Sequence, residues 1–148
     1  MKKRGILFAA LSIFCLWAFC GVANAAIGIG TAPGGIKLAI SGNISIANGG
    51  SVTLNIVATN NSGNTINVGL LKALVINPVT GARAFGPFDT TANLPALLGP
   101  GQSVSFPAYV LGPIPGNLGN QTLAVVFLVL DTNNNVVGTA GWGLLVQP

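Results

Sequence analysis

Apolar side chains alternate with polar or small ones along much of the chain, and this period of two is the strongest constraint on its fold. In residues 51–59, four apolar residues fall on one face, namely Val52, Leu54, Ile56 and Ala58. Asn55 and Thr59 fall on the other face. Successive side chains of a β-strand point to opposite faces, so the alternation predicts strands with one buried face. No segment after the first twenty-five residues keeps the 3.6-residue period of an amphipathic helix. The chain is therefore predicted to be all-β.

Seven segments carry the strand pattern, separated by stretches rich in Gly, Pro and Asn. The segment 122–130 (TLAVVFLVL) is apolar on both faces and too short to cross a bilayer as a helix, so it is predicted as a central strand covered on both sides. Pro107 interrupts another strand and predicts an edge position or a bulge there. The predicted strands are 36–40, 51–59, 66–76, 82–86, 103–110, 122–130 and 136–146.

The turns between these strands resemble those of a known class of domain. The segment 98–106 (LGPGQSVSF), followed by Pro113-Ile114-Pro115 and the run 121–131, resembles the second half of bacterial immunoglobulin-like and fibronectin-type-III-like domains. The turn 77–81 (NPVTG) resembles the hairpin turn of their first half. The resemblance covers most of residues 36–146 and implies one immunoglobulin-like β-sandwich of about seven strands over residues 36–148. It implies little about function, because many unrelated modules share this pattern.

The first twenty-five residues have the pattern of a secretory signal peptide. Lys2, Lys3 and Arg4 precede an apolar run over residues 6–19, and Ala23-Asn24-Ala25 supplies a small-x-small cleavage site. An uncleaved membrane anchor is the alternative, since the apolar stretch is near the lower limit for a span. Cleavage after Ala25 predicts a secreted protein without membrane insertion, extracellular or on the cell surface, with the periplasm as the other compartment.

Charged side chains are scarce once the signal peptide is set aside. Residues 26–148 carry Lys37, Lys72 and Arg83 against Asp89 and Asp131, a net charge of 3 − 2 = +1. Nucleic-acid binding is not expected, because phosphate neutralisation needs clustered Lys and Arg. Soluble monomers usually protect their surface and sheet edges with charge. The shortage therefore predicts a surface covered by copies of the same chain or by another surface protein.

Residues for catalysis and cofactor binding are also scarce. The chain has no His, and both cysteines, Cys15 and Cys20, lie in the predicted signal peptide. A Ser, Cys or Thr nucleophile would lack its usual base. Asp89 and Asp131 are the only carboxylate side chains, and turn formation accounts for the second. The chain is predicted to be no enzyme and to need no cofactor.

One short motif resembles the start of a calcium-binding loop. Residues 131–135 (DTNNN) match the D-x-N-x-N opening, but Val136 stands where the loop needs Gly, and Trp142 stands where it needs Glu. A hairpin turn explains these residues better, and no metal site is predicted. Zinc and copper lack ligands altogether.

Two features are candidates for contacts with a partner. Residues 26–35 are predicted to form a flexible N-terminal arm in which Ile27 and Ile29 alternate with small residues. The arm could pair with its own domain as an edge strand or add to the sheet of a neighbouring copy, as in chaperone-assembled pilins, which it resembles in shape. Trp142, between Gly141 and Gly143, is either a core residue or an aromatic contact for a sugar or partner.

These observations predict a secreted, non-enzymatic structural or adhesive module, a self-associating subunit of an extracellular fibre or surface layer. The alternative is a monomeric binding module that recognises a protein or polysaccharide through its loops. Behaviour as a monomer at high concentration would favour the alternative.

Overall fold

In the computed structural model, residues 28–31 and 35–148 are described, the first group by its backbone alone. They form ten β-strands, and the described part of the chain contains no helix, hence none that could cross a membrane. The predicted signal peptide and Ile27 lie outside the described residues. The strands are β1 (Gly28–Thr31), β2 (Ile36–Gly42), β3 (Ser45–Ile46), β4 (Val52–Asn60), β5 (Ile66–Ile76), β6 (Arg83–Thr90), β7 (Ala96–Leu98), β8 (Ser103–Leu111), β9 (Thr122–Asp131) and β10 (Val136–Val146).

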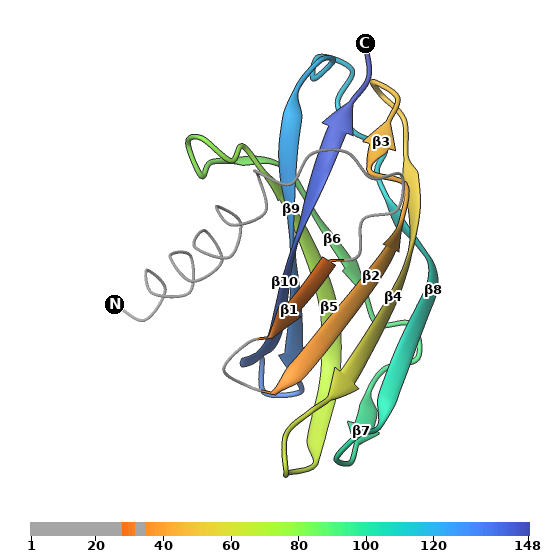
Figure 1. The fold of residues 1–148 in the computed structure, drawn as a ribbon, viewed down its shortest axis with the longest axis vertical. Helices are drawn as coiled ribbons and strands as arrows, with labels where there is room; N and C mark the ends of the chain where they lie inside the picture. The colour runs from red at the N-terminus through yellow and green to blue at the C-terminus, as the bar shows by residue number, and fades with distance from the viewer. Residues whose placement is uncertain (1–27, 32–34) are drawn as a thin grey trace.

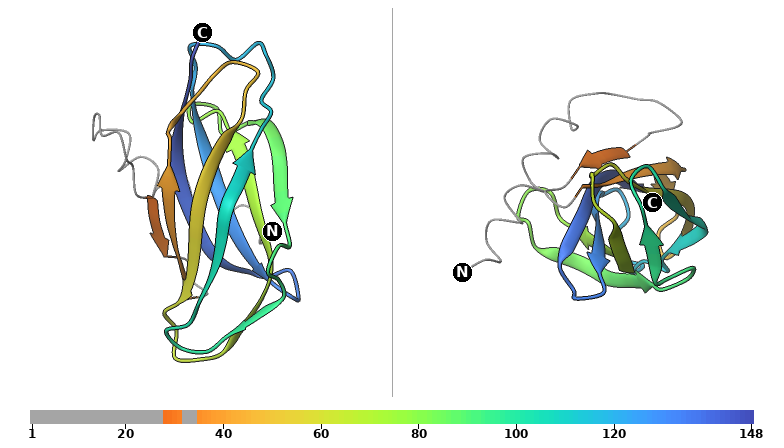
Figure 2. Two further views of the ribbon diagram at one scale, coloured as in Figure 1. Left: turned by 90° about the vertical axis from the view of Figure 1, so that its right-hand side faces the viewer. Right: turned by 90° about the horizontal axis from the view of Figure 1, so that it is seen from below.

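The strands build two sheets that face each other across one core (Figures 1 and 2). The four-stranded sheet has the order β1-β2-β4-β8, and the six-stranded sheet has the order β3-β10-β9-β5-β6, with β7 also paired to β5. Neighbours pair antiparallel except β3, which lies parallel to the end of β10. The all-β, immunoglobulin-like sandwich predicted from the alternation is confirmed.

All seven predicted strands are present, and three short ones were not predicted. Pro107 lies in β8, which is an edge strand and carries a register shift against β4, so both expectations for this proline hold. β9 takes the predicted central position, between β10 and β5. The additional strands are β1, β3 and β7. Residues 28–31 of the predicted arm pair with β2 of the same chain, which is one of the two arrangements expected for the arm.

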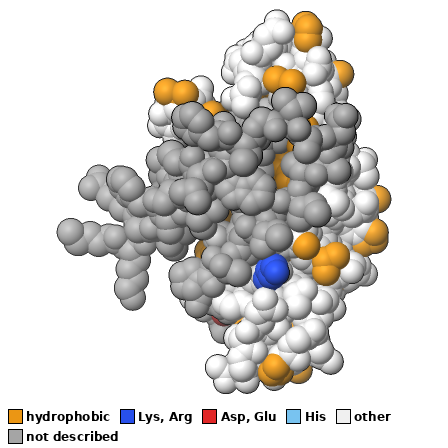
Figure 3. Space-filling model, in the orientation of Figure 1, with side chains coloured by type: hydrophobic (Ala, Val, Ile, Leu, Met, Phe, Trp, Pro, Cys, Tyr) orange, Lys and Arg blue, Asp and Glu red, His pale blue; other side chains and the backbone are white. Residues whose placement is uncertain are grey.

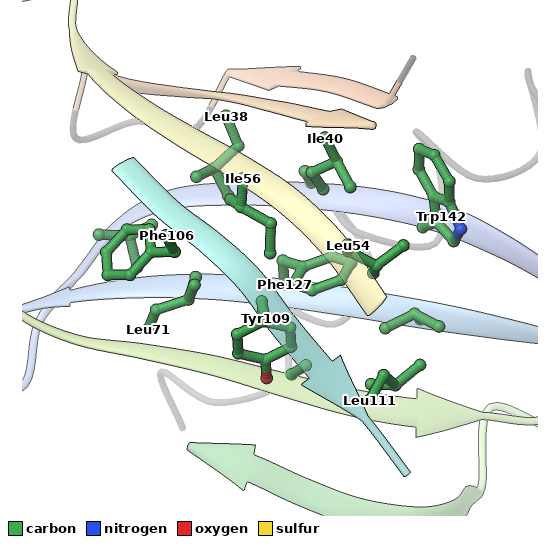
Figure 4. Packing of buried hydrophobic residues seen from close by; sticks show 14 of the residues in the cluster. Leu38, Ile40, Leu54, Ile56, Leu71, Phe106, Tyr109, Leu111, Phe127 and Trp142 are labelled. Atoms are coloured by element: carbon green, nitrogen blue, oxygen red, sulfur yellow. The ribbon is translucent and has the colours of Figure 1, made fainter. Parts of the chain in front are cut away.

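The core lies between the sheets and follows the period of two (Figure 4). In β4 the alternate residues Val52, Leu54, Ile56 and Ala58 are buried, and Phe127 of β9 is among the largest fully buried side chains. Each large apolar side chain contributes about 1.5–3 kcal/mol when fully buried. A core of this kind stabilises a domain of this length without a disulfide.

One polar side chain is buried completely at the end of β4. Asn60 donates from Nδ2 to the backbone oxygens of Asn64 (2.7 Å) and Leu98 (2.8 Å). Its Oδ1 accepts from the backbone N–H of Ser62 (2.9 Å) and from the Ser62 hydroxyl (2.7 Å). Asn60 therefore fixes the β4–β5 loop against β7, and its full set of partners offsets the loss of hydration on burial.

Candidate functional site

The outer faces of the two sheets differ in polarity. On the four-stranded sheet, exposed positions such as Ser41, Thr53 and Asn55 are polar, as in most solvated sheets. On the six-stranded sheet, the positions that face away from the core are mainly apolar. We call this surface the outer apolar face; it consists of Leu70, Leu74, Val126, Leu128, Leu130 and Leu145.

The strand register places these side chains in rows across the sheet. Leu74 of β5 lies opposite Val126 of β9, which lies opposite Gly141 of β10. Leu70 lies opposite Leu130 in the same way. The face thus has a ridge of branched side chains on β5 and β9 beside a strip of β10 that contains glycines and no bulky side chain until Leu145.

Exposure along this face is intermediate rather than low. Val126, Leu128 and Leu130 are half-buried, whereas the inward residues of the same strand, such as Phe127 and Val129, are fully buried. The outer face of β9 is therefore partly covered within the described residues, since Ala124 at the same parity is fully buried. Large apolar side chains that stay half-exposed on a sheet mark an interaction surface.

Little charge interrupts this surface. The Lys72 Nζ atom lies 3.5 Å from an Asp89 carboxylate oxygen, and this is the only ion pair among the described residues. Both side chains are partly exposed, so the pair contributes little to stability. Lys72 lies between Leu70 and Leu74 on β5, opposite Leu128 of β9. The pair therefore lies within the outer apolar face, on the side next to β6. Figure 3 shows the same scarcity on another side of the molecule, where charged atoms form small patches among uncharged ones.

A second feature is a cleft of about 610 Å³ between the edge strands β6 and β8, which we call the edge cleft. Two hydrogen bonds cross between its walls. Tyr109 Oη donates to the Phe88 carbonyl oxygen (2.8 Å), and Asn93 Nδ2 donates to the Ser105 carbonyl oxygen (3.1 Å). The cleft is lined by Pro87, Phe88, Asp89, Thr90, Ala92, Asn93, Phe106, Pro107, Ala108, Tyr109 and Val110.

Two adjacent lining residues of the edge cleft, Ala108 and Tyr109, are held by specific contacts. Ala108 has a positive φ of 54°, which is unusual for a residue with a side chain, and its N–H donates to Asn55 Oδ1 (3.2 Å). Tyr109 packs edge-on against Phe127 with ring centroids 6.0 Å apart. Burial, and then the negative charge of Asp89, raise the pKa of Tyr109 well above its ordinary value. The tyrosine is thus a neutral hydrogen-bond donor and no acid–base group near neutral pH.

The structure keeps the two aspartates apart. Asp89 lies opposite Lys72, and Asp131 lies opposite Val68, on the two different neighbours of β5. The spacing of residues and strands puts their Cα atoms roughly 15 Å apart. The carboxyl groups of glycoside hydrolases lie about 5–9.5 Å apart. Asp89 and Asp131 therefore do not form such a pair.

Asp131 has the role of a turn residue. Its carboxylate accepts hydrogen bonds from the N–H groups of Asn133 and Asn135 (both 2.8 Å) and from Asn135 Nδ2 (3.0 Å). These bonds, the Asn135 side chain first, lower the pKa of Asp131. The carboxylate is thus engaged within its own turn, and no cluster of three metal-ligating His, Cys, Asp or Glu side chains occurs in residues 28–31 and 35–148.

Trp142 lies on the inner face of β10 and is only 2% exposed (Figure 4). The core position predicted for it is the one present, and the ring is not available as the alternative aromatic contact on the surface. The reason is the strand period, which turns residues 140, 142, 144 and 146 inward together. Its indole Nε1 is buried and has no hydrogen-bond partner among residues 28–31 and 35–148.

The arm residues can be placed only in part. Ile29 lies in β1 opposite Ala39 of β2, and Ala39 is exposed. The two glycines beside it, Gly28 and Gly30, lie opposite buried residues of β2, Ile40 and Leu38 respectively. Sequence reasoning missed the outer apolar face, although β5 and β9 gave a signal for it. Both strands carry apolar residues in consecutive positions, which leaves some of them on the outer face.

No family model and no curated protein matches the sequence. The structure is similar to the crystal structure of a Niemann-Pick type C2 protein from the Japanese carpenter ant, with a TM-score of 0.50 and 10% identity over 86% of this chain and 96% of that one. It also matches a CARDB domain from Pyrococcus furiosus, solved with two metal ions, with a TM-score of 0.47 and 13% identity over 85% and 94% of the two chains. The first similarity supports the immunoglobulin-like sandwich and extends to the fold alone.

Proposed function

We propose that this chain is a secreted, non-enzymatic structural or adhesive module of bacterial immunoglobulin-like type. Its mature form, after cleavage behind Ala25, is a self-associating subunit of an extracellular fibre or surface layer. The partner is a second copy, which packs its outer apolar face against the same face of the first. The observation that carries this proposal is the polarity of that face, which is apolar on a sheet whose other side already faces the core.

The shape of the face supports a second copy as its occupant. The ridge formed by Leu74 and Val126 lies beside the strip of β10 around Gly141 and Gly143. Gly143 has open space where a side chain would be. A two-fold arrangement places the ridge of each copy over the glycine strip of the other, and facing sheets pack about 10 Å apart in this manner.

Charge supports the same occupant. The face contains one ion pair, Lys72–Asp89, whose opposite charges neutralise each other, so two copies can meet there without burying a lone charge. The absence of catalytic side-chain pairs among the described residues is in line with a structural role.

The test is the particle mass in solution of the full chain and two variants, measured by light scattering and electron microscopy. Val126→Lys introduces a charge at the centre of the outer apolar face, and Thr53→Lys introduces the same charge on the polar outer face of the other sheet. We expect fibres or large particles for the wild type and Thr53→Lys, and particles at least fivefold smaller for Val126→Lys. Unchanged denaturation midpoints would show that both variants fold.

A wild-type chain that stays monomeric at high concentration would contradict this proposal and favour a binding module. The edge cleft supports that second candidate, because it combines about 610 Å³ of space with polar groups on Asp89, Thr90 and Asn93. Its ligand would be a protein segment or polysaccharide. Asn93→Ala would then weaken binding, and Val126→Lys would not.

A further inference from the structure

The sandwich has two open sides, and only one of them is protected against pairing with another strand. On the side of β6 and β8, Pro87 and Pro107 each remove a backbone donor from an edge strand. The Ser105 carbonyl oxygen is already bonded to Asn93, and the Tyr109 hydroxyl ties the two edges together. An additional strand would find few unpaired backbone N–H and C=O groups on this side.

The opposite side, formed by β1, β2 and β10, has no such protection. Neither β1 nor β10 contains a charged residue or a proline. The N–H groups of Leu145 and Gln147 donate toward β3, to Ile44 (2.7 Å) and Ile46 (2.8 Å), while the Val146 N–H donates to Gln121 on the other side. Because backbone groups alternate along a strand, those of Gly141 and Gly143 also point away from β9. Among the described strands, β3 pairs only with the last two residues of β10, so this edge stays open beyond them.

β1 is the edge strand on this side, and it forms a ladder with β2 alone. It pairs with β2 over four residues and lies against β10 without forming a ladder with it. Its positions opposite the inward residues Leu38 and Ile40 are Gly30 and Gly28. A glycine buries no side chain, so at these two positions β1 pairs with β2 through its backbone hydrogen bonds only. Any identical strand can supply these bonds equally well.

Gly35 marks the point at which the body of the domain begins after β1. Gly35 is fixed in the body, because its carbonyl oxygen accepts from the Asn61 N–H (2.8 Å) and its positive φ of 85° suits glycine. A Cβ at this position would lie 2.6 Å from the Ser62 Cβ. In the sequence, three residues separate Thr31, the last residue of β1, from the anchored Gly35.

We propose that residues 28–31 of one copy pair with β2 of a second copy, in the place that β1 occupies within the chain. This inference rests on the proposed self-association and names a segment and an acceptor for it. The exchanged strand makes the same backbone hydrogen bonds to the second copy that it makes within its own chain. Exchange of identical elements is therefore a low-cost route to assembly. Reciprocal exchange gives a dimer, and exchange from each copy to the next gives a fibre. The outer apolar face stays free to join such units sideways.

The test uses pairs of cysteines placed in register on different copies. Both native cysteines, Cys15 and Cys20, are replaced by Ser, so that each chain has only the introduced thiol. One tagged copy carries Ile29→Cys and a differently tagged copy carries Ala39→Cys, at positions that lie opposite each other in the ladder. Cα atoms at such positions are about 4.5–5.5 Å apart, within disulfide reach. The two copies are mixed in denaturant, refolded together and oxidised mildly.

We expect a disulfide-linked species with both tags, at least tenfold above a control in which Thr53→Cys replaces Ala39→Cys. Thr53 is exposed on the same sheet but two strands away from β1. Large particles with no doubly tagged product would overturn strand exchange and leave self-association through the outer apolar face intact. No large particles and no product would contradict both. A second, independent experiment places Ile29→Cys and Ala39→Cys in one chain. Oxidation of this chain as a monomer forms a disulfide that keeps β1 on its own β2. If this form assembles as well as the wild type, strand exchange is also overturned.

Discussion

The Tyr109 hydroxyl donates a hydrogen bond to the Phe88 carbonyl oxygen, 2.8 Å away, and thereby joins the free edge of one sheet to the free edge of the other. The two residues lie on β8 and β6, which share no backbone ladder. The contact keeps the wall of the edge cleft closed at this point. It also leaves the opposite side of the sandwich, around β1, as the side where another strand can be added.

The variant Tyr109→Phe measures the contribution of this contact. The ring and its packing on Phe127 are kept, and the Phe88 carbonyl oxygen loses its donor. We expect a loss of about 1 kcal/mol in the free energy of unfolding, the usual net value of one such hydrogen bond. Urea denaturation followed by tryptophan fluorescence measures it. A variant as stable as the wild type would mean that the contact does not hold the two edges together.

The same residue makes stability sensitive to alkaline pH. Burial, followed by the charge of Asp89, raises the pKa of Tyr109 in the folded state above its ordinary value of 10.0. Above that pH the unfolded chain releases the proton and the folded chain keeps it, so the free energy of unfolding falls as pH rises. The slope for one proton is about 1.4 kcal/mol per pH unit. Because the chain has one Tyr, its absorbance at high pH reports this group alone, and Tyr109→Phe should show a shallower decline.

Asn60 is expected to be the polar side chain whose loss destabilises the domain most. Asn60→Ala leaves the buried carbonyl oxygen of Leu98 without its donor. It also removes the partner of two part-buried groups, the Asn64 carbonyl oxygen and the Ser62 N–H. Unpaired buried groups cost about 1–3 kcal/mol each, so we expect a loss of about 3 kcal/mol. Asn67→Ala is the control, because Asn67 is exposed and makes one long side-chain contact (3.4 Å). Equal effects of the two substitutions in chemical denaturation would contradict this role.

The long strands could be predicted because their alternation is a local property. β4 and β8 show it directly, and even the proline in β8 indicated an edge with a bulge. β3 and β7 could not be predicted in this way, because two or three residues cannot show a period. β3 is defined by its parallel pairing with the far end of the chain, at Leu145 and Val146, which no local pattern reports.

The candidate surfaces were harder to predict from the sequence. The motif 77–81 and the turn at Asp131 could be interpreted locally, since their hydrogen bonds join residues two to four positions apart. The outer apolar face depends on which strands become neighbours, as in the row from Leu74 through Val126 to Gly141. The edge cleft likewise joins residues about twenty positions apart, such as Phe88 and Tyr109, from different sheets.

The turn at Asp131 predicts a loss of stability in acid. Hydrogen bonds from Asn135, and from Asn133, lower the pKa of Asp131 in the folded state below its ordinary value of 3.8. The stabilisation is therefore fully present above that pH and is lost as pH falls below it and the folded carboxylate takes up its proton. We expect Asp131→Asn to remove this part of the pH dependence. Denaturation curves between pH 5 and pH 2.5 test it, and parallel curves for the two proteins would contradict the assignment.

Two glycines on β10 differ in the space around them, so substituting each by alanine compares a crowded position with an open one. A Cβ on Gly138 would lie 2.9 Å from both the Cβ and the carbonyl oxygen of Ile36, where β10 passes closest to β2. We expect Gly138→Ala to lower the free energy of unfolding by about 1–3 kcal/mol, as overpacking of a core does. Gly143→Ala places the same methyl group in open space and should be neutral or stabilising by about 0.5 kcal/mol. If both variants fold equally well, β10 and β2 are not in close contact at Ile36. If Gly143→Ala folds normally but forms smaller particles, the glycine strip is part of the surface on which a second copy packs.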